Sequence, residues 1–361
     1  MKKICFFSGD ITRSGGTERV AAMIANELAK EGKYKICFLS LCEQKEDVFY
    51  TLHPTINRYK LGEKWIQPGP GYLPLIPKLR RFLKEEKIDL IIDIDIVLDS
   101  LSIPAVWGIK TKVLSWEHSN CFYEFSVLYR KLILKFSVKF SDYIVTLTET
   151  DKQNYAKMLN RTQNIEAIHN PIEEDGYSNA GNRENSIITV GRLVIGKGTD
   201  YLSEIATRIL SKYPSWKWYV LGDGEERAAL EKVIYDNNLQ DRFVLTGLVN
   251  NVGEYLAKSK MFVFTSKSEG LPMCLLEAKA HELPCISFDI PTGPSEIIED
   301  GVNGFLVRPF DCEDMIHKIS TLIENEDMLN SFSANAKTNM EKFCMDSIMK
   351  SWNRVLDSLC E

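Results

Sequence analysis

Two carboxylates bracket the start of a predicted helix in the stretch Ser268-Glu269-Gly270-Leu271-Pro272-Met273-Cys274-Leu275-Leu276-Glu277. The apolar run Met261–Thr265 precedes it and is typical of a buried strand. A glycine marks the turn, and a proline suits the first turn of the helix. Open α/β sheets bind ligands at the carboxyl ends of their strands, beside helix N-termini that favour phosphate. Glu269 and Glu277 can therefore meet the hydroxyl groups of a ribose or a hexose next to such a phosphate.

The length and composition favour a two-domain globular protein. The chain has 361 residues, 44% of them hydrophobic and 26% charged, which fits two domains of roughly 150 to 180 residues. Residues 1–170 carry 25 Lys and Arg against 20 Asp and Glu, whereas the remainder carries 19 against 30. This asymmetry suggests that the first half meets an anionic surface, although a modest excess is also typical of a solvated face.

The cysteines and the N-terminus indicate a cytoplasmic protein. The nine cysteines are dispersed and form no C-x-x-C pair, which is typical of reduced, buried thiols. The start Met1-Lys2-Lys3 runs directly into a short apolar strand, too short for the core of a signal peptide. No apolar run approaches the ~20 residues needed to span a bilayer.

A strand, a glycine-rich loop and a helix open the chain. The strand is Lys3–Ser8, the loop Gly9–Arg19 contains Gly15-Gly16, and apolar residues recur at helical spacing over Val20–Lys30. Glycines let the backbone approach a ligand and leave the helix N-terminus open. The loop lacks the G-x-G-x-x-G pattern, so an ordinary strand-to-helix turn stays an alternative.

Strands and helices alternate along both halves of the chain, which predicts parallel sheets built from βαβ units. The polar segment Glu173–Asn185 is typical of a linker, and residues 43–80 are predicted to form an irregular surface loop or a segment on the acceptor side. The further predicted strands are Lys35–Leu41, Asp89–Asp95, Lys112–Trp116, Asp142–Leu147, Ile165–Ile168, Ser186–Val190, Trp216–Leu221, Phe243–Thr246 and Pro284–Phe288.

Polar side chains follow two strands of the first half. Asp93 and Asp95 could form a metal-binding pair, but acidic residues at a strand end more often cap a loop. His118 follows Lys112–Trp116, where it could face a ligand, although a lone histidine is more often structural.

A basic stripe runs along the predicted helix Leu128–Phe140. Lys131, Lys135 and Lys139 recur every four residues between apolar and aromatic positions. This pattern matches a helix lying on anionic lipid headgroups, and the basic helix Pro77–Lys84 could assist. A solvated flank on a core helix is the alternative.

The segment Gly191–Thr199 comes within one residue of a nucleotide-binding P-loop. Gly198 stands where that motif needs a hydroxyl for Mg²⁺, which argues against a P-loop NTPase. Arg192 and Lys197 nevertheless suit a diphosphate, one as a bidentate fork and one as a point charge.

Together these motifs resemble the retaining glycosyltransferases of family 4. The resemblance covers nearly the whole chain and is densest from Ile187 to Val307. It rests on the following motifs in their expected order: Gly15-Gly16-Thr17-Glu18-Arg19, Asn170-Pro171, Gly191-Arg192 with Lys197, Gly222-Asp223-Gly224, Glu269 to Glu277, and Gly301-x-Asn303-Gly304.

The resemblance implies the GT-B fold, with two Rossmann-like α/β domains facing each other across a cleft. The acceptor-side domain would comprise residues 1–170 and a C-terminal helix at about 346–361 that crosses back to it. The nucleotide-sugar domain would comprise residues 171–345, and Met349–Leu359 is the core of the expected crossing helix.

The resemblance also implies roles for individual residues. The catalytic residues would be Glu269 and His118, without Glu269 being a nucleophile by default. The donor diphosphate would be bound by Arg192, Lys197, Gly15 and Gly16. The donor sugar would be contacted by Glu269 and the backbone of Gly270 and Leu271, and the ribose by Glu277. No metal or other cofactor is expected.

The implied reaction moves a hexose or an N-acetylhexosamine from a nucleotide sugar, by expectation UDP-linked, to a glycan. The segment Phe288–Ile298 resembles enzymes of bacterial surface-polysaccharide and lipid-linked oligosaccharide assembly. The acceptor would then be carried on a polyprenyl diphosphate, and the enzyme would be peripheral on the inner face of the cytoplasmic membrane, with no nucleic-acid partner. The alternatives are a non-catalytic sugar-nucleotide-binding partner and a P-loop NTPase.

Overall fold

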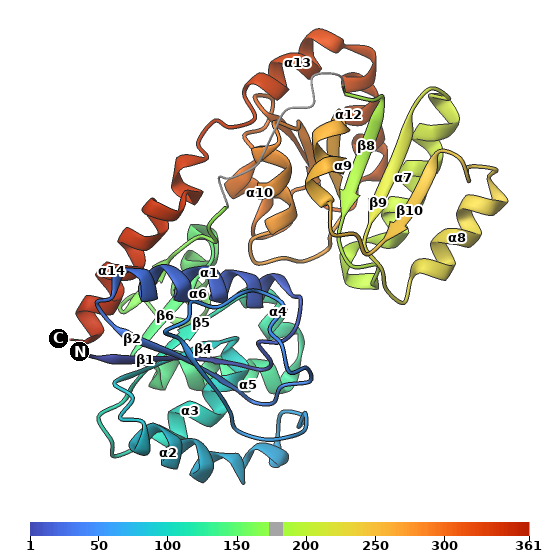
Figure 1. Ribbon diagram of the computed structural model, residues 1–361. Helices are drawn as coiled ribbons and strands as arrows, with labels where there is room; N and C mark the ends of the chain where they lie inside the picture. Colours follow the sequence, from blue (N-terminus) through green and yellow to red (C-terminus); the bar gives the residue numbers. More distant parts are fainter. Residues whose placement is uncertain (173–182, 361) are drawn as a thin grey trace. The chain divides into compact units, whose positions relative to one another are not determined.

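The computed structural model describes residues 1–172 and 183–360. The chain divides into two units, Met1–Pro171 with Lys342–Glu361, and Ile172–Glu341. The greater part of the predicted linker, residues 173–182, lies outside the described residues. Each unit is a parallel sheet covered by helices (Figure 1).

The N-terminal unit contains a seven-stranded sheet in the order β3-β2-β1-β4-β5-β6-β7. Its strands are β1 Lys3–Ser8, β2 Lys35–Ser40, β3 Asn57–Lys60, β4 Leu90–Ile94, β5 Lys112–Trp116, β6 Tyr143–Thr146 and β7 Ile165–Ala167. Its helices are α1 Gly16–Glu31, α2 Leu75–Glu85, α3 Asp99–Val106, α4 Cys121–Ser126, α5 Leu128–Phe140, α6 Glu149–Leu159 and α14 Met345–Cys360, with short 3₁₀ turns at Pro70–Tyr72 and Ile96–Leu98.

The C-terminal unit contains a six-stranded sheet in the order β10-β9-β8-β11-β12-β13. Its strands are β8 Ser186–Val190, β9 Lys217–Leu221, β10 Phe243–Gly247, β11 Met261–Phe264, β12 Cys285–Phe288 and β13 Gly304–Val307. Its helices are α7 Thr199–Lys212, α8 Arg227–Asp236, α9 Val252–Lys258, α10 Met273–Ala280, α11 Pro294–Ile297, α12 Cys312–Glu324 and α13 Glu326–Ala334, with a 3₁₀ turn at Ile195–Lys197. A last 3₁₀ turn, Glu341–Phe343, spans the division between the units.

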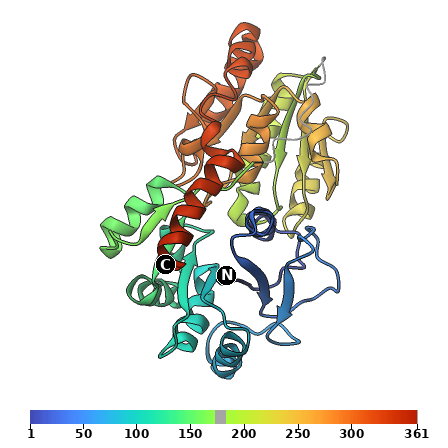
Figure 2. The ribbon, with the colours of Figure 1, turned by 60° about the vertical axis from the view of Figure 1, so that its left-hand side comes forward.

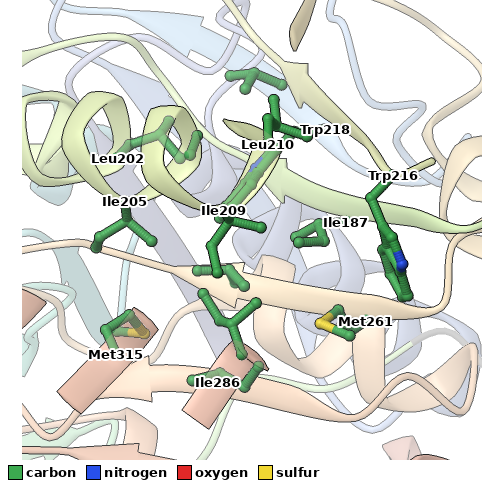
Figure 3. Packing of buried hydrophobic residues seen from close by; sticks show 14 of the residues in the cluster. Ile187, Leu202, Ile205, Ile209, Leu210, Trp216, Trp218, Met261, Ile286 and Met315 are labelled. Atoms are coloured by element: carbon green, nitrogen blue, oxygen red, sulfur yellow. The ribbon is translucent and has the colours of Figure 1, made fainter. Parts of the chain in front are cut away.

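Alternation along the strands builds the core of the C-terminal unit. Ile187, Trp218, Met261 and Ile286 project from neighbouring strands toward α7 and α12, where they pack against aliphatic side chains such as Leu202 (Figure 3). The next residue of each strand faces the opposite way, toward α9 and α10. Because helices cover both faces, the central strands are mostly apolar and buried along their length.

The C-terminal helix α14 belongs to the N-terminal unit, and it starts at Met345, next to the expected start at about residue 346. Trp352 packs edge-on against Trp116 of β5 at 4.7 Å between ring centroids. Asp357 accepts hydrogen bonds from Lys33 and Tyr34, beyond the end of α1. The two ends of the chain consequently lie close together, as both ribbon views show (Figures 1 and 2).

The prediction that residues 43–80 are irregular was wrong at Asn57–Lys60, which form strand β3 and extend the edge of the sheet by parallel pairing with β2. The predicted helix Pro77–Lys84 is confirmed as α2, which begins slightly earlier, at Leu75. β3 is polar because an edge strand is partly solvated, so it lacks the apolar run that marks the other strands.

The order of strands reverses once in each sheet. In the N-terminal unit the reversal lies between β1 and β4, and in the C-terminal unit between β8 and β11. Connections leave such a pair of strands in opposite directions, so a crevice opens beyond their carboxyl ends. A binding site is therefore expected at the loops that follow these four strands.

Candidate functional site

Two loops of the C-terminal unit join at the reversal between β8 and β11. The amide of Lys267 donates to the carbonyl of Gly196 at 3.1 Å. The hydroxyl of Thr265 donates to the carbonyl of Lys197 at 3.3 Å. These bonds fix the loop after β8 against the loop after β11.

Gly198 is required by the close approach of these loops. Its φ of +68° lies in the left-handed region, and a Cβ there would stand 1.9 Å from the carbonyl oxygen of Thr265. The glycine that departs from the P-loop motif is thus needed for loop packing. The hydroxyl of Thr199 donates inside its own loop, to Val194 at 3.1 Å, which leaves it directed away from any metal in front of the loop.

Lys197 and Glu269 form an ion pair within this joined structure. The Nζ atom lies 2.5 Å from Oε1 of Glu269, and the hydroxyl of Ser266 donates to the same oxygen at 2.7 Å. Both side chains are mostly buried, so the pair is only weakly screened by solvent. A cation and a carboxylate predicted separately from the sequence are therefore neighbours.

The turn that carries Glu269 is supported by the loop after β12. The hydroxyl of Thr292 donates to the carbonyl of Glu269. Gly293 has a φ of +101°, and a Cβ there would clash with Pro272 at 2.6 Å. Pro272 is the N-cap of α10 rather than its first helical residue. Gly270 and Leu271 are buried in this turn.

Glu277 lies half-buried on α10, and its backbone carbonyl accepts from the His281 ring at 2.9 Å. Burial raises the pKa of the Cys274 thiol, and the charges of Glu269 and Glu277 raise it further, whereas Lys197 opposes them. The thiol thus lies within electrostatic reach of both carboxylates, a proximity that was not predicted from the sequence.

Arg192 occupies a turn that the loop after β9 supports. The amide of Leu193 donates to the carbonyl of Asp223 at 2.9 Å, and a Cβ on Gly222 would stand 1.9 Å from the carbonyl oxygen of Gly191. The Arg192 side chain is exposed, and it has no ion pair with the residues that the structure describes. Its guanidinium is available to an anionic ligand.

The glycine loop of the N-terminal unit is organised by a buried carboxylate. Asp10 accepts hydrogen bonds from the amide of Thr12 at 2.9 Å and from the amide of Gln44 at 3.2 Å. Gly15 is the N-cap of α1 and carries no side-chain cap, and Gly16 is the first helical residue. The first-turn amides of α1 are therefore presented at the reversal between β1 and β4.

His118 follows β5 at the same edge of the sheet. Its imidazole packs against Trp116 at 4.4 Å between ring centroids, and burial lowers the pKa of His118 to about 3. The ring is therefore neutral at pH 7. Its Nε2 atom is shielded from solvent and has no hydrogen-bond partner among residues 1–172 and 183–360.

A buried charge network lies beside His118 and was not predicted from the sequence. Arg130 of α5 holds both carboxylate oxygens of Glu124 at 2.9 Å through Nε, and it contacts Asp95 at 3.1 Å. Burial raises the pKa of Glu124 to about 7, against the lowering effect of Arg130. Burial also raises the pKa of Glu117, and nearby carboxylates including Glu124 add to this.

The two aspartates considered as a metal pair have separate partners. Asp93 is buried beside Asp99 and accepts from Ser102, whereas Asp95 contacts Arg130 and caps the turn after β4 through Val97 at 2.9 Å. The capping interpretation of Asp95 is confirmed. No cluster of three potential metal ligands occurs among the described residues.

Helices α4 and α5 present apolar and basic side chains to solvent. Leu128 is 75% exposed and Leu132 is 61% exposed, and Lys135 and Lys139 are exposed as well. The one carboxylate in this stretch, Glu124, is buried against Arg130. Within the described part of the chain, no helix is both long and apolar enough to cross a bilayer.

Two glycosyltransferase families match successive parts of the chain. The family described as Glycosyltransferase Family 4 matches residues 14–175, and Glycosyl transferases group 1 matches residues 173–339. An uncharacterized glycosyltransferase of Haemophilus influenzae is 31% identical over 357 residues, which cover 99% of this chain and 100% of that relative.

A second relative has a more specific name. The GalNAc-alpha-(1->4)-GalNAc-alpha-(1->3)-diNAcBac-PP-undecaprenol alpha-1,4-N-acetyl-D-galactosaminyltransferase of Campylobacter jejuni is 27% identical over 368 residues, covering 99% of this chain and 98% of the relative. Among solved structures, S. aureus TarM in a complex that includes UDP superposes with a TM-score of 0.81 at 16% identity, covering 99% of this chain and 100% of that one. The latter likeness shows the fold alone. With two Rossmann-like units and these relatives, the chain belongs to the GT-B glycosyltransferases and is a transferase enzyme.

Proposed function

We propose that this glycosyltransferase moves a hexose or an N-acetylhexosamine from a UDP-sugar to a glycan, with retention of the anomeric configuration. The observation that carries the proposal is the joined pair of loops at the β8–β11 reversal. There Lys197 is held 2.5 Å from Glu269, on the loop that leads into the helix bearing Glu277. A cation beside two carboxylates suits a ligand that combines phosphates with hydroxyl groups.

In this proposal, different residues of the C-terminal unit bind different parts of the donor. Lys197 and Arg192 bind the diphosphate and offset the negative charge that grows on the departing UDP. Glu277 accepts from the ribose hydroxyls. Glu269 accepts from the donor sugar, together with the backbone of Gly270 and Leu271. Because Ser266 and Lys197 already bind Oε1 of Glu269, this carboxylate is suited to positioning the sugar rather than attacking it.

The N-terminal unit contributes the acceptor side. The first-turn amides of α1, beginning at Gly15-Gly16, can donate to an anionic or hydroxyl-bearing ligand. His118 is neutral, and its Nε2 is unpartnered but shielded from solvent, so an acceptor that displaces this cover can exchange a hydrogen bond with Nε2 without introducing a charge. We propose that it orients that hydroxyl.

We further propose that no metal is needed, because Lys197 and Arg192 supply two positive charges for the leaving diphosphate. Donor turnover is therefore expected to persist in EDTA. A loss of turnover that Mg²⁺ or Mn²⁺ restores would contradict this part of the proposal.

The acceptor that we propose is a glycan on a polyprenyl diphosphate, in bacterial cell-surface glycan synthesis. Its support is the name of the Campylobacter relative, which includes PP-undecaprenol, and the apolar, basic surface of α4 and α5. Leu128 and Leu132 can enter the interfacial region of a bilayer while Lys135 and Lys139 meet anionic headgroups. The enzyme would then be peripheral on the cytoplasmic face of the membrane.

Product analysis tests the reaction. The full chain is incubated with a polyprenyl-diphosphate-linked glycan as acceptor and with UDP-glucose, UDP-galactose or one of their N-acetylamino forms as donor. UDP release is measured, and the anomeric configuration of any product is read by NMR. We expect an α-linked product from one donor and a loss of at least about 100-fold in turnover for Lys197→Ala and Glu269→Ala. Lys212→Ala, on the exposed end of α7, is the control. Full turnover by both site variants would contradict the site assignment, and a β-linked product would contradict retention.

Vesicle co-sedimentation tests the membrane proposal. The chain should bind vesicles that contain phosphatidylglycerol more strongly than neutral phosphatidylcholine vesicles, and the triple change of Lys131, Lys135 and Lys139 to Glu should abolish the difference. Lys232→Glu, on the exposed face of α8 in the other unit, should leave it intact. Binding that ignores lipid charge would contradict the proposal.

A non-catalytic sugar-nucleotide-binding role is the second candidate. It would show UDP binding without turnover of any donor. An NTPase is disfavoured because Gly198 stands where a P-loop needs a hydroxyl for Mg²⁺, and the hydroxyl of Thr199 donates within its own loop.

A further inference from the structure

Tryptophan exposure in this chain is confined to two positions. Of the six tryptophans, Trp116, Trp216, Trp218 and Trp352 are buried, whereas Trp65 is 43% exposed and Trp107 is 60% exposed. Trp107 follows α3 and precedes β5, so it lies at the amino edge of the N-terminal sheet. Trp65 lies at the opposite, carboxyl edge.

The position of Trp65 is set by its contact with Gly9. Atoms Cζ3 and Cη2 of the indole would lie 3.2 and 3.3 Å from a Cβ built on Gly9, the residue directly after β1. A methyl group on residue 9 would be in tight contact with the indole, so the ring lies this close without displacement because residue 9 has no side chain. Since β1 borders the strand reversal of this unit, the indole lies beside the crevice where a ligand is expected.

The segment that carries Trp65 is fixed at both ends. On one side, the amides of Leu61 and Gly62 donate to Ser40 and Leu41 at 2.8 and 2.9 Å. On the other side, Tyr72 is buried in the core of the unit. The indole is thus held against the sheet edge while much of its surface faces solvent. An aromatic ring held in this way needs little further ordering when a ligand stacks on it.

The geometry points to a carbohydrate as that ligand. The face of a pyranose ring presents C–H groups, which are attracted to the negative face of an aromatic ring. The hydroxyls around the sugar rim need polar partners, and after β5 lies the unpartnered Nε2 of His118, whose cover from solvent the ligand would replace. β4 alone separates β1 from β5, so the two strand ends lie about 10 Å apart at ~4.8 Å per strand. That separation corresponds to a disaccharide rather than a single sugar.

We propose that Trp65 stacks on the acceptor glycan, on the sugar that precedes the one whose hydroxyl reacts. Gly9 leaves room for the indole in this position. This inference rests on the proposed function, because it takes His118 as the residue beside the acceptor hydroxyl. It makes Trp65 a determinant of acceptor specificity and gives it no part in donor binding.

The test is ¹⁹F NMR of the full chain labelled with 5-fluorotryptophan. The resonances of Trp65 and Trp107 are assigned by single Trp→Phe changes. N,N′-diacetylchitobiose, lactose and maltose are then titrated as probes, with and without UDP. We expect at least one disaccharide to shift the Trp65 resonance in a saturable way and to leave that of Trp107 unmoved.

Matched variants complete the test. Trp65→Ala should weaken the binding of that disaccharide by about tenfold. Gly9→Ala should also weaken this binding, because it displaces the indole ring, and Trp107→Ala should leave it unchanged. UDP affinity should be the same in all three variants. No saturable shift at Trp65 with any probe, or an equal shift at Trp107, would overturn the inference. If the unaltered chain does not bind UDP, this result would instead count against the proposed function.

Discussion

Lys279 offers a quantitative test of how the helix that bears Glu277 is held. This lysine is completely buried on α10, and its Nζ donates to the backbone carbonyl of Asn303 at 3.1 Å. Burial lowers the pKa of Lys279 from 10.5 to about 8. At about 1.4 kcal/mol per pKa unit, the charged lysine costs the folded state about 3 kcal/mol at pH 7.

Lys279→Met keeps the shape and removes the charge. The variant also loses one hydrogen bond to a carbonyl, worth about 1 kcal/mol. The net expectation is a gain of about 2 kcal/mol in the free energy of unfolding at pH 7, measured by urea denaturation. Between pH 8 and 10.5 the unfolded lysine holds more protons than the folded one, so the stability of the unaltered chain rises with pH through this window. The advantage of the variant should therefore shrink toward pH 10.5.

The control for this prediction is Lys212→Met, at an exposed end of α7, which should change stability little at either pH. Equal destabilisation of the Lys279→Met variant at pH 7 and at pH 10 would contradict this expectation. It would mean that the hydrogen bond to Asn303 outweighs the burial of the charge.

Two further predictions concern single contacts. Arg130→Met should lower the free energy of unfolding by about 3 kcal/mol or more at pH 8 in urea denaturation, because it leaves the buried Glu124 without its cation. The loss of stability should diminish at pH 5, where Glu124 is protonated. A loss of stability that does not depend on pH would contradict this expectation. Gly198→Ala should reduce thermal stability and UDP binding, because its Cβ would clash with the carbonyl of Thr265. Gly196→Ala is the control and should change neither property, because the space around Gly196 is open. Equal behaviour of the two variants would contradict the loop geometry.

The strands that could be predicted from the sequence are those buried on both faces. Lys3–Ser8, Lys112–Trp116 and Ser186–Val190 were predicted with their observed bounds, because their residues are almost all apolar or small. β3 was missed because its Asn57-Arg58-Tyr59-Lys60 is polar. α3 was missed because a short apolar helix that contains Pro104 has no amphipathic period.

The candidate site was predictable in its residues and not in its contacts. Glu269 and Lys197 follow from motifs 72 residues apart, but their pairing depends on β8 and β11 being neighbours in the sheet. Lysine and arginine are seldom buried, so nothing in the sequence marks Lys279 or Arg130 as interior. Exposure likewise separates Trp65 from the four buried tryptophans only once the chain is folded.

We propose that the loops at the β8–β11 reversal of the C-terminal unit bind the nucleotide of a sugar donor, and isothermal calorimetry of UDP with the full chain measures this binding. We expect saturable binding that falls at least tenfold in Lys197→Ala and in Glu277→Ala, and is unchanged in Lys212→Ala. UDP binding that is equal in all four proteins would contradict it.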